Sequence, residues 1–387
     1  MQRVFLLKWF RFSLFALYVS VSANATADAP TPGAAPNLAL LLPVDSPDLG
    51  PAARAVQQGF MAAAKILHAG LPIRVYADFD DQHSVVDAYN EAVSNGAVAV
   101  VGPLTREDIR KLAAEPGLPV PTLALNVVEG SASRQLYFFG LAIEAEAQQV
   151  ARLARRQKLR QAIVISDSDP LSRRLQYAFE EQWTALGGSV AQEIDFDGDA
   201  AVLAAISPTP DSMVFLATDI EKSRLIRPYL PNSLPVYATS QIFAGNSDTL
   251  VNFDLDGIRF VDMPWLMQMD QPAISAYPRA NPPLPTDQER LYALGIDAYN
   301  LIQILIANQM KTALPFDGVT GTIRLERQTF VREALPSLFV QGHAQWADAP
   351  IAPAAPMFPA QTRNASGVDA ASSVLEAAPV ESTPINP

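Results

Sequence analysis

Residues 37–125 combine two hydrophobic patterns that alternate along the chain. Short apolar runs such as 38–42 stop at turn residues, and between them apolar residues recur every three or four positions, as at Val56 and Phe60. A short apolar run predicts a strand buried on both faces, and the longer period predicts an amphipathic helix. The patterns predict strands at 38–42, 73–76, 97–101 and 120–125, with helices at 52–68, 84–94 and after Thr105.

The same alternation restarts after residue 140. A long helix is expected at 287–310, a hairpin around Gly321 at 319–325, and one more apolar segment at 330–340. Strands that alternate with helices form parallel sheets. Two such series predict an α/β protein with two Rossmann-like lobes, each built on a parallel sheet. The second series has helices at 143–157, 171–186, 199–206 and 219–230, and strands at 162–165, 190–194, 213–217, 236–238 and 258–261.

The two ends of the chain carry different patterns. Residues 1–12 contain basic side chains and no acidic one, an apolar run follows, and Ala23-Asn24-Ala25 has the small-x-small form of a signal-peptidase site. We therefore expect a cleaved signal peptide at 1–25 and a flexible linker at 26–36, with an uncleaved anchor as the alternative. Cleavage implies a soluble protein of the periplasm. Residues 346–387 are rich in Pro and Ala without periodicity, which predicts a disordered tail.

Charge and residue inventory narrow the classes of function. The formal net charge is -12, and an acidic chain is a poor partner for nucleic acid or anionic lipid. The sequence has no cysteine, so we expect no disulfide, no thiolate nucleophile and no lipid anchor on a lipobox cysteine. One basic run stands against this balance. It forms either a solvated helix face or a docking surface for an acidic partner, and it consists of Arg152, Arg155, Arg156, Lys158 and Arg160.

The motifs of common enzyme sites are missing from the sequence. There is no GxxxxGKS/T phosphate loop, no GxGxxG, no GxSxG, no SxxK and no HExxH, and the three histidines are far apart. Acidic clusters after predicted strands, at 78–81 and 195–199, are more typical of turns and helix caps than of metal sites. We expect no catalytic residue, no metal and no cofactor, and an enzyme is the least supported class of function.

Polar residues follow several predicted strands at their carboxyl ends. Small ligands bind at these ends of an open parallel sheet, near the point where the strand order reverses. Thr105 is the most specific of them, because a hydroxyl beside free amides at a helix start suits a carboxylate or a phosphate. The alternative is structural: Thr105 and Asp219 only cap their helices, and Asn126 only closes a turn. Trp265 either lines the cleft or a partner surface, or packs in the core or between the lobes. The cleft candidates are Asp45, Leu104, Thr105, Asn126, Asp167, Ser168, Thr218, Asp219, Ser240, Gln241 and Trp265.

Several segments of the chain resemble one family of proteins. They are, in chain order, LALLLPVDSPDLGPAARAVQQGFMAAA, AVAVVGPLTREDIRKLA, PVPTLALN, PVYATSQIFAG, DLDGIRFVDMPWLM and RLYALGIDAYNLI. Together they resemble the penicillin-binding protein activators of the LppC/LpoA family over roughly 37–345. The most specific pieces are VYATSQIFAG and DGIRFVDMPWLM, since the VGP and ALN pieces are shared with amino-acid-binding relatives.

The resemblance implies a type I periplasmic-binding-protein fold with two interleaved lobes joined by three crossings. Lobe 1 would comprise 37–139 and 240–317, and lobe 2 would comprise 140–239 and 318–345. The resemblance also implies a noncatalytic periplasmic regulator that stimulates a bifunctional, class A penicillin-binding protein by direct contact. The alternative that the residues leave open is a solute-binding receptor that holds an amino acid or a related small molecule in the cleft.

Overall fold

The computed structural model describes residues 34–67, 70–77, 83–130 and 133–347. The expected signal peptide and most of the expected linker and tail lie outside the described residues. The tail was expected to begin at Trp346, but this residue ends a strand. Among the described residues, no helix combines the length and apolar character needed to cross a membrane.

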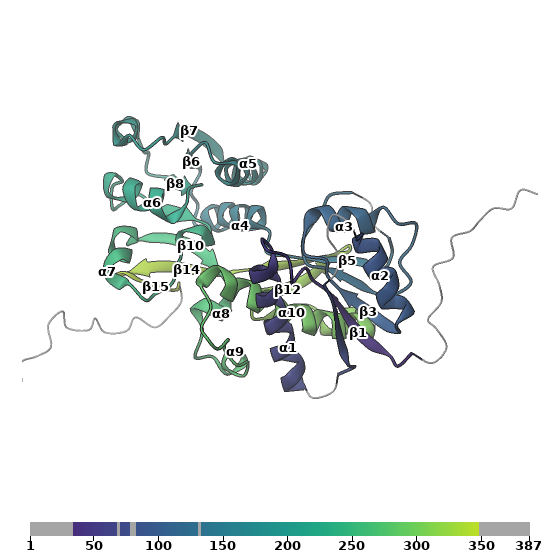
Figure 1. The fold of residues 1–387 in the computed structure, drawn as a ribbon. Helices are drawn as coiled ribbons and strands as arrows, with labels where there is room; N and C mark the ends of the chain where they lie inside the picture. The colour runs from purple at the N-terminus through teal and green to yellow at the C-terminus, as the bar shows by residue number, and fades with distance from the viewer. Residues whose placement is uncertain (1–33, 68–69, 78–82, 131–132, 348–387) are drawn as a thin grey trace, which may run out of the picture. The chain divides into compact units, whose positions relative to one another are not determined.

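The first sheet has eight strands in the order β11-β12-β13-β5-β4-β3-β1-β2 (Figure 1). Strands β1 to β5 run parallel to one another, and β13 pairs in parallel with β5. Strand β12 pairs antiparallel with both β11 and β13. The bounds are β1 Asn37–Leu41, β2 Ile73–Tyr76, β3 Ala97–Val101, β4 Thr122–Ala124, β5 Leu136–Phe139, β11 Phe316–Gly318, β12 Gly321–Glu326 and β13 Thr329–Glu333.

The second sheet has seven strands in the order β15-β14-β10-β9-β8-β6-β7. Strands β6 to β10 are parallel, and the hairpin of β14 and β15 pairs antiparallel with β10. In each sheet the order of the parallel strands reverses once, beside β1 in the first and beside β6 in the second. The bounds are β6 Gln161–Ser166, β7 Ser189–Asp195, β8 Ser212–Leu216, β9 Val236–Ala238, β10 Ile258–Asp262, β14 Leu335–Val340 and β15 His343–Trp346.

Helices cover both faces of each sheet, which is why the central parallel strands are apolar on both sides, whereas the edge strands β2 and β7 are partly exposed. The α-helices are α1 Gly50–Leu67, α2 Val85–Ser94, α3 Arg106–Ala113, α4 Ile143–Arg156, α5 Pro170–Ala185, α6 Ile220–Ile226, α7 Thr249–Asn252, α8 Pro264–Met267, α9 Pro272–Ser275, α10 Thr286–Ile306 and α11 Met310–Ala313. The short 3-10 helices are η1 Ala200–Ala205, η2 Arg227–Tyr229, η3 Ser240–Ile242 and η4 Phe253–Leu255.

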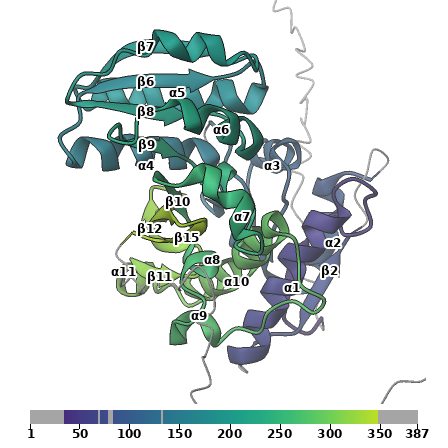
Figure 2. The same cartoon turned by 90° about the vertical axis from the view of Figure 1, so that its left-hand side faces the viewer.

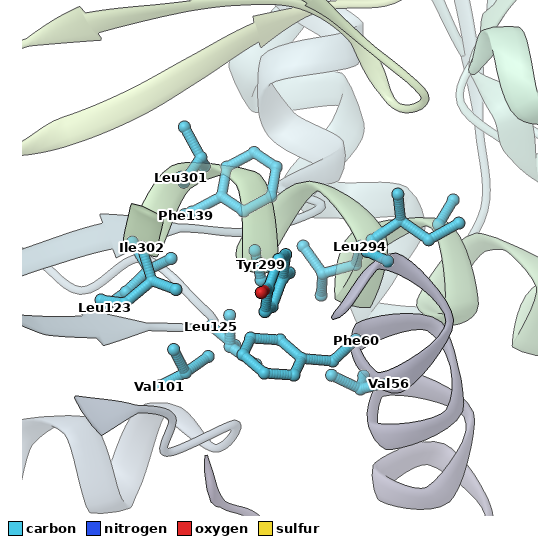
Figure 3. Close-up of a cluster of buried hydrophobic side chains, with 14 of the residues drawn as sticks. Val56, Phe60, Val101, Leu123, Leu125, Phe139, Leu294, Tyr299, Leu301 and Ile302 are labelled. Atoms are coloured by element: carbon cyan, nitrogen blue, oxygen red, sulfur yellow. The ribbon is translucent and has the colours of Figure 1, made fainter. Parts of the chain in front are cut away.

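Alternate residues of one strand feed different cores. In β1, Leu38 and Leu40 pack with α1 and α10, whereas Ala39 and Leu41 pack with α2 and α3. In the core under α1 and α10, the rings of Phe60 and Tyr299 meet edge to face with centroids 5.0 Å apart (Figure 3). The second sheet has the same arrangement, with α4 and α5 on one face and η1, α6, η3 and η4 on the other.

Two glycines allow α1 and α10 to approach closely. A Cβ atom on Gly59 would lie 1.8 Å from the carbonyl oxygen of Tyr292, and one on Gly295 would lie 2.1 Å from that of Val56. No side chain can be accommodated at either contact without moving a helix backbone. The approach brings α10, which is distant in sequence, onto the face of the first sheet.

Local structure differs from the sequence expectation in several places. Strand β15 was not expected, and the hairpin expected at 319–325 instead joins β11 to β12 through a turn at 319–320. Strand β5 was not expected, although it lies between β4 and β13 in the middle of the first sheet. The apolar segment 330–340 was expected to be one element, but it forms parts of β13 and β14, which belong to different sheets. The expected helix at 199–206 is the shorter 3-10 helix η1, whose first turn Asp199 caps.

Sheet membership also differs from the expected division at 239/240 and 317/318. Strand β10 pairs in parallel with β9 and so extends the second sheet, while β12 and β13 extend the first. The chain passes between the sheets at 140–142, then from β10 through α8 and α9 to α10, and last at Ala334. Hydrogen bonding between strands determines which sheet each strand joins. The hydrophobic pattern of a strand does not carry this information.

Candidate functional site

The largest described pocket lies where elements of the two sheets meet, and its volume is about 550 Å³. Helix α3 and the end of β4 contribute from the first sheet, and α4 and α5 contribute from the second. Four arginines and three carboxylates face it, so its walls are strongly polar. The lining residues are Arg106, Asn126, Leu141, Ala142, Ile143, Glu144, Glu146, Leu171, Arg174, Ser240, Gln241, Asp287, Arg290, Leu291 and Arg332.

A buried ion pair forms part of the pocket floor. Glu146 in the first turn of α4 pairs with Arg332 of β13, and both side chains are almost fully buried. The second oxygen of the Glu146 carboxylate accepts a hydrogen bond from the backbone amide of Ser240, at 3.0 Å. Arg332 also donates to the carbonyl oxygen of Thr320, at 3.2 Å. One carboxylate therefore holds together an element of the first sheet and the end of β9 in the second.

A second buried pair joins α10 to the end of β10. Arg290 donates to Asp262 Oδ2 at 2.7 Å, and burial raises the pKa of Asp262 against the influence of this arginine. The same guanidinium donates to the carbonyl oxygens of Ser240 and Phe243, at 3.1 and 2.8 Å. Most donors of Arg290 are thus satisfied inside the protein, as a buried charge requires.

At the rim, Glu144 lies between two arginines, one on a helix that packs on the first sheet and one on a helix that packs on the second. Arg106 at the start of α3 approaches Glu144 at 3.5 Å, and Arg174 of α5 pairs with the same carboxylate oxygen. Burial alone would raise the pKa of Glu144, but the two arginines hold it below its ordinary value. Arg106 also donates to Asn126 Oδ1, at 3.4 Å. The rim is therefore an ion-paired contact between the two lobes.

Of the candidates that follow strands of the first sheet, only Asn126 lines this pocket. Its amide donates to the carbonyl oxygen of Leu104, at 3.3 Å. Thr105 caps α3, since its hydroxyl accepts from the amide of Asp108 at 3.1 Å and donates to that residue's carboxylate at 2.6 Å. Asp45 is exposed in the loop after β1. In this structure the Thr105 hydroxyl therefore acts as the cap of α3, as the structural alternative expected.

Three of the candidates after β6 and β8, Asp167, Thr218 and Asp219, line a separate small cavity of about 30 Å³, which has room for water. The carboxylate of Asp167 accepts from Lys222 Nζ at 2.8 Å, which raises the pKa of Lys222. Asp219 caps α6 through the amide of Lys222 at 2.8 Å, and the hydroxyls of Thr218 and Ser223 are 2.9 Å apart. Ser168 is exposed beside them.

Of the remaining candidates, two line the interlobe pocket and one does not. Ser240 takes part through its backbone, and Gln241 lines both cavities. Trp265 is fully buried: its ring stacks on Tyr292, Arg279 lies 3.5 Å above the ring centroid, and its Nε1 donates to Glu289 at 2.6 Å. The Trp265 side chain therefore packs α8 against α10.

Sequence reasoning missed the charged residues of the pocket, which come from helices, several of them from first turns, and from β13. One signal was present, because three of the segments that carry the family resemblance meet here. Asp262 of DMPWLM pairs with Arg290 of RLYALGIDAYNLI, which in turn binds the carbonyl of Ser240 in YATSQIFAG. Within the described residues, no group of three or more His, Cys, Asp and Glu side chains is placed to hold a metal ion.

Two parallel sheets whose strand orders each reverse once, with a pocket between the lobes, define the type I periplasmic-binding-protein class of fold. A family model described as LppC putative lipoprotein matches residues 33–208 and 206–336. The chain belongs to this family, which confirms the resemblance found in the sequence.

The similar proteins include activators and transporter components. The penicillin-binding protein activator LpoA of Haemophilus influenzae is 27% identical over 304 residues, which are 74% of this chain and 50% of that protein. The solved C-domain of LpoA from the same species, titled a regulator of PBP1A, is 25% identical with a TM-score of 0.68, and the match covers 80% of this chain and 99% of that one. The chain spans about half the length of the curated relatives it matches.

A third similar structure is that of a putative branched-chain amino acid ABC transporter from Chromobacterium violaceum. It is 37% identical, with a TM-score of 0.70, and the match covers 78% of this chain and 99% of that one. This similarity supports the same fold class.

Proposed function

We propose that this protein is a noncatalytic regulator that stimulates a bifunctional, class A penicillin-binding protein by direct contact. Membership of the LppC family, together with relatives named as penicillin-binding protein activators, carries the proposal. The geometry supports it because polar groups at the strand ends are engaged within the protein, as helix caps and ion pairs between the lobes. Polar groups that are engaged in this way are not available for catalysis, which is consistent with a protein that acts through contact.

The test is an assay with the purified class A synthases of the same cell. We expect the protein to bind one synthase and to raise its rate of glycan polymerisation or transpeptidation. A monofunctional transpeptidase serves as the control and should be unaffected. The protein alone should not turn over the lipid-linked substrate. Absence of binding and of any rate change with every class A synthase would overturn the proposal.

The cellular place that fits this function is the periplasm, as a soluble protein. The expected signal peptide and the family description as a putative lipoprotein support an envelope location. Fractionation of the native host tests it, and the protein should be released with the periplasmic contents. Recovery in the cytoplasm would contradict the envelope location, and recovery only with membranes would contradict the soluble form.

A receptor for an amino acid or a related small molecule is the second candidate, and the interlobe pocket favours it. The pocket has room for such a ligand, and the partly exposed Arg106 and Arg174 at its rim could exchange Glu144 for a ligand carboxylate. A ligand at 100 times its Kd adds about 2.7 kcal/mol of stability, which a melting experiment detects. A flat response over libraries of amino acids and muropeptides would exclude these ligand classes.

A further inference from the structure

Exposed apolar side chains gather on the outer side of the second sheet, over α6, η2, α7 and η4. Helix α6 contacts both η2 and η4, and η4 also contacts η2 and α7, so these elements form one surface (Figure 2). We call the exposed apolar residues here the α7 patch. Its members are Leu225, Tyr229, Leu250, Val251 and Phe253, with exposed fractions of 57%, 60%, 80%, 41% and 44%.

The backbone beneath the patch is held firmly. Asp248 caps α7 by accepting from the amide of Val251 at 3.2 Å, and the Asn252 side chain donates to the carbonyl oxygen of Gly245 at 3.0 Å. Gly342, in the turn between β14 and β15, packs so closely that a Cβ there would lie 2.1 Å from the carbonyl oxygen of Thr249. A preorganised apolar surface loses little backbone freedom when a partner covers it.

Near the patch, two arginines are engaged within the protein, whereas two aspartates are exposed to solvent. Arg227 turns inward, where it donates to the carbonyl oxygens of Asp256 and Leu230 at 2.9 and 3.1 Å. Arg224 is also paired, because it donates to the carboxylate of Glu221 at 2.7 Å and to the side-chain oxygen of Asn252 at 3.4 Å. The carboxylates of Asp248 and Asp254 remain at the exposed surface. The rim of the patch is therefore acidic.

The basic run on and after α4 offers a weaker surface. Arg155 donates to the carbonyl oxygens of Leu159 and Leu186, at 2.6 and 3.2 Å, and lies over the ring of Trp183. Arg156 pairs with Glu333 at 3.4 Å. Arg155 and Arg156 thus contact the neighbours of α4, whereas Lys158 and Arg160 remain exposed. The basic run is therefore only partly available, and the α7 patch is the better docking candidate.

We propose that the α7 patch is the surface through which this protein docks on its partner, a folded protein whose contact face has an apolar centre flanked by Lys and Arg. The inference rests on the proposed function, in which that partner is a penicillin-binding protein. An apolar centre within a polar rim is the usual anatomy of a protein interface. The acidic rim selects a basic face and speeds the encounter with it.

The experiment compares binding of the full protein and two variants to the purified class A synthase. Leu250→Ser combined with Phe253→Ser should weaken binding about 10-fold or more, which is about 1.4 kcal/mol or more. Tyr177→Ser on α5, where the side chain is 70% exposed away from the patch, is the matched control and should bind like the wild type. Asp254→Lys should slow association at low salt, because it reverses a charge on the rim.

Three results separate the possible failures. If the wild type binds no class A synthase, the proposed function and the docking surface both fail. If the wild type binds and the double variant binds equally well, only the docking surface is overturned. If sedimentation shows a wild-type dimer that the double variant dissociates, while synthase binding is unchanged, the patch contacts a second copy instead. Melting temperatures like that of the wild type would show that the variants are folded.

Discussion

Arg332 and Glu146 bring opposite charges together inside the protein, where neither would be stable alone. Removing the arginine leaves a buried carboxylate without its counter-charge, and such a loss costs about 3–5 kcal/mol. Arg332→Met should lower the free energy of unfolding by this amount in urea titrations. The control is Arg173→Met, because Arg173 pairs with an exposed carboxylate at Asp195 and should contribute about 1 kcal/mol or less. Equal losses in the two variants would contradict the argument.

Asp297 is another buried carboxylate, but within the described part of the chain no Lys, Arg or His forms an ion pair with it. Its carboxylate accepts from the amides of Val319 and Thr320, at 3.0 and 2.8 Å, and from the Thr320 hydroxyl at 2.7 Å. Burial raises its pKa from 3.8 to about 6, although these hydrogen bonds act in the opposite direction. The folded protein therefore binds a proton at this site more tightly than the unfolded chain does.

The consequence is a defined pH dependence. The stability that Asp297 contributes is fully present below about pH 4 and is lost as the pH rises through about 6, a total change of about 3 kcal/mol. Asp297→Asn has no such titration. The difference in unfolding free energy between wild type and variant should therefore shift by this amount as the pH rises through this range, against the wild type. Urea titrations across the range measure it, and parallel curves would contradict the raised pKa.

Among the elements, the contact between α1 and α10 depends on two glycines rather than on large side chains. Gly59→Ala would drive a methyl group into the backbone of α10, and overpacking of this kind costs about 1–3 kcal/mol. The loss should appear although alanine favours a helix by about 1 kcal/mol over glycine. Gly117→Ala is the matched control, because nothing lies within 4 Å of a Cβ there. Thermal unfolding compares them, and equal melting temperatures would sink the prediction.

Most strands could be predicted because a parallel strand buried on both faces is a short apolar run. Strand β5 was missed because it follows the polar segment 129–135, which is typical of a loop; its length does not explain the miss, since β2 is equally short and was predicted. The boundary between β13 and β14 was missed because Glu333, Ala334 and Leu335 contain no turn residue, although the chain changes sheets there. Membership of a sheet is a property of backbone pairing, which local patterns do not record.

For the molecule as a whole, the strand-end rule located Asn126, Ser240 and Gln241 at the interlobe pocket. It could not locate the charges that define the pocket, since residues such as Glu146 and Arg332 are 186 positions apart and meet only through the crossings between the sheets. The rule also could not tell a free polar group from one that caps a helix, as Thr105 does.

The interleaving of the sheets predicts that the first lobe cannot fold from its N-terminal part. The fragment 34–139 lacks α10, which supplies much of the core against β1 and β3, and lacks β13, the neighbour of β5. It should show no cooperative melting by circular dichroism, whereas the chain 34–347 should melt cooperatively. Adding the segment 264–333 to the fragment should restore the transition. Cooperative melting of the fragment alone would contradict this prediction.

The side chain of Gln149 in α4 binds the backbone of Ala334, where the chain makes its third crossing between the sheets. Its side-chain amide donates to the carbonyl oxygen of Ala334 at 2.7 Å and accepts from the amide of the same residue at 3.0 Å. At this one point a side chain takes the place of a neighbouring strand. A chimaera that exchanges the β14–β15 hairpin between relatives should therefore take α4 from the same relative. The side chain that binds the start of the hairpin, Gln149, lies 185 residues earlier in the chain.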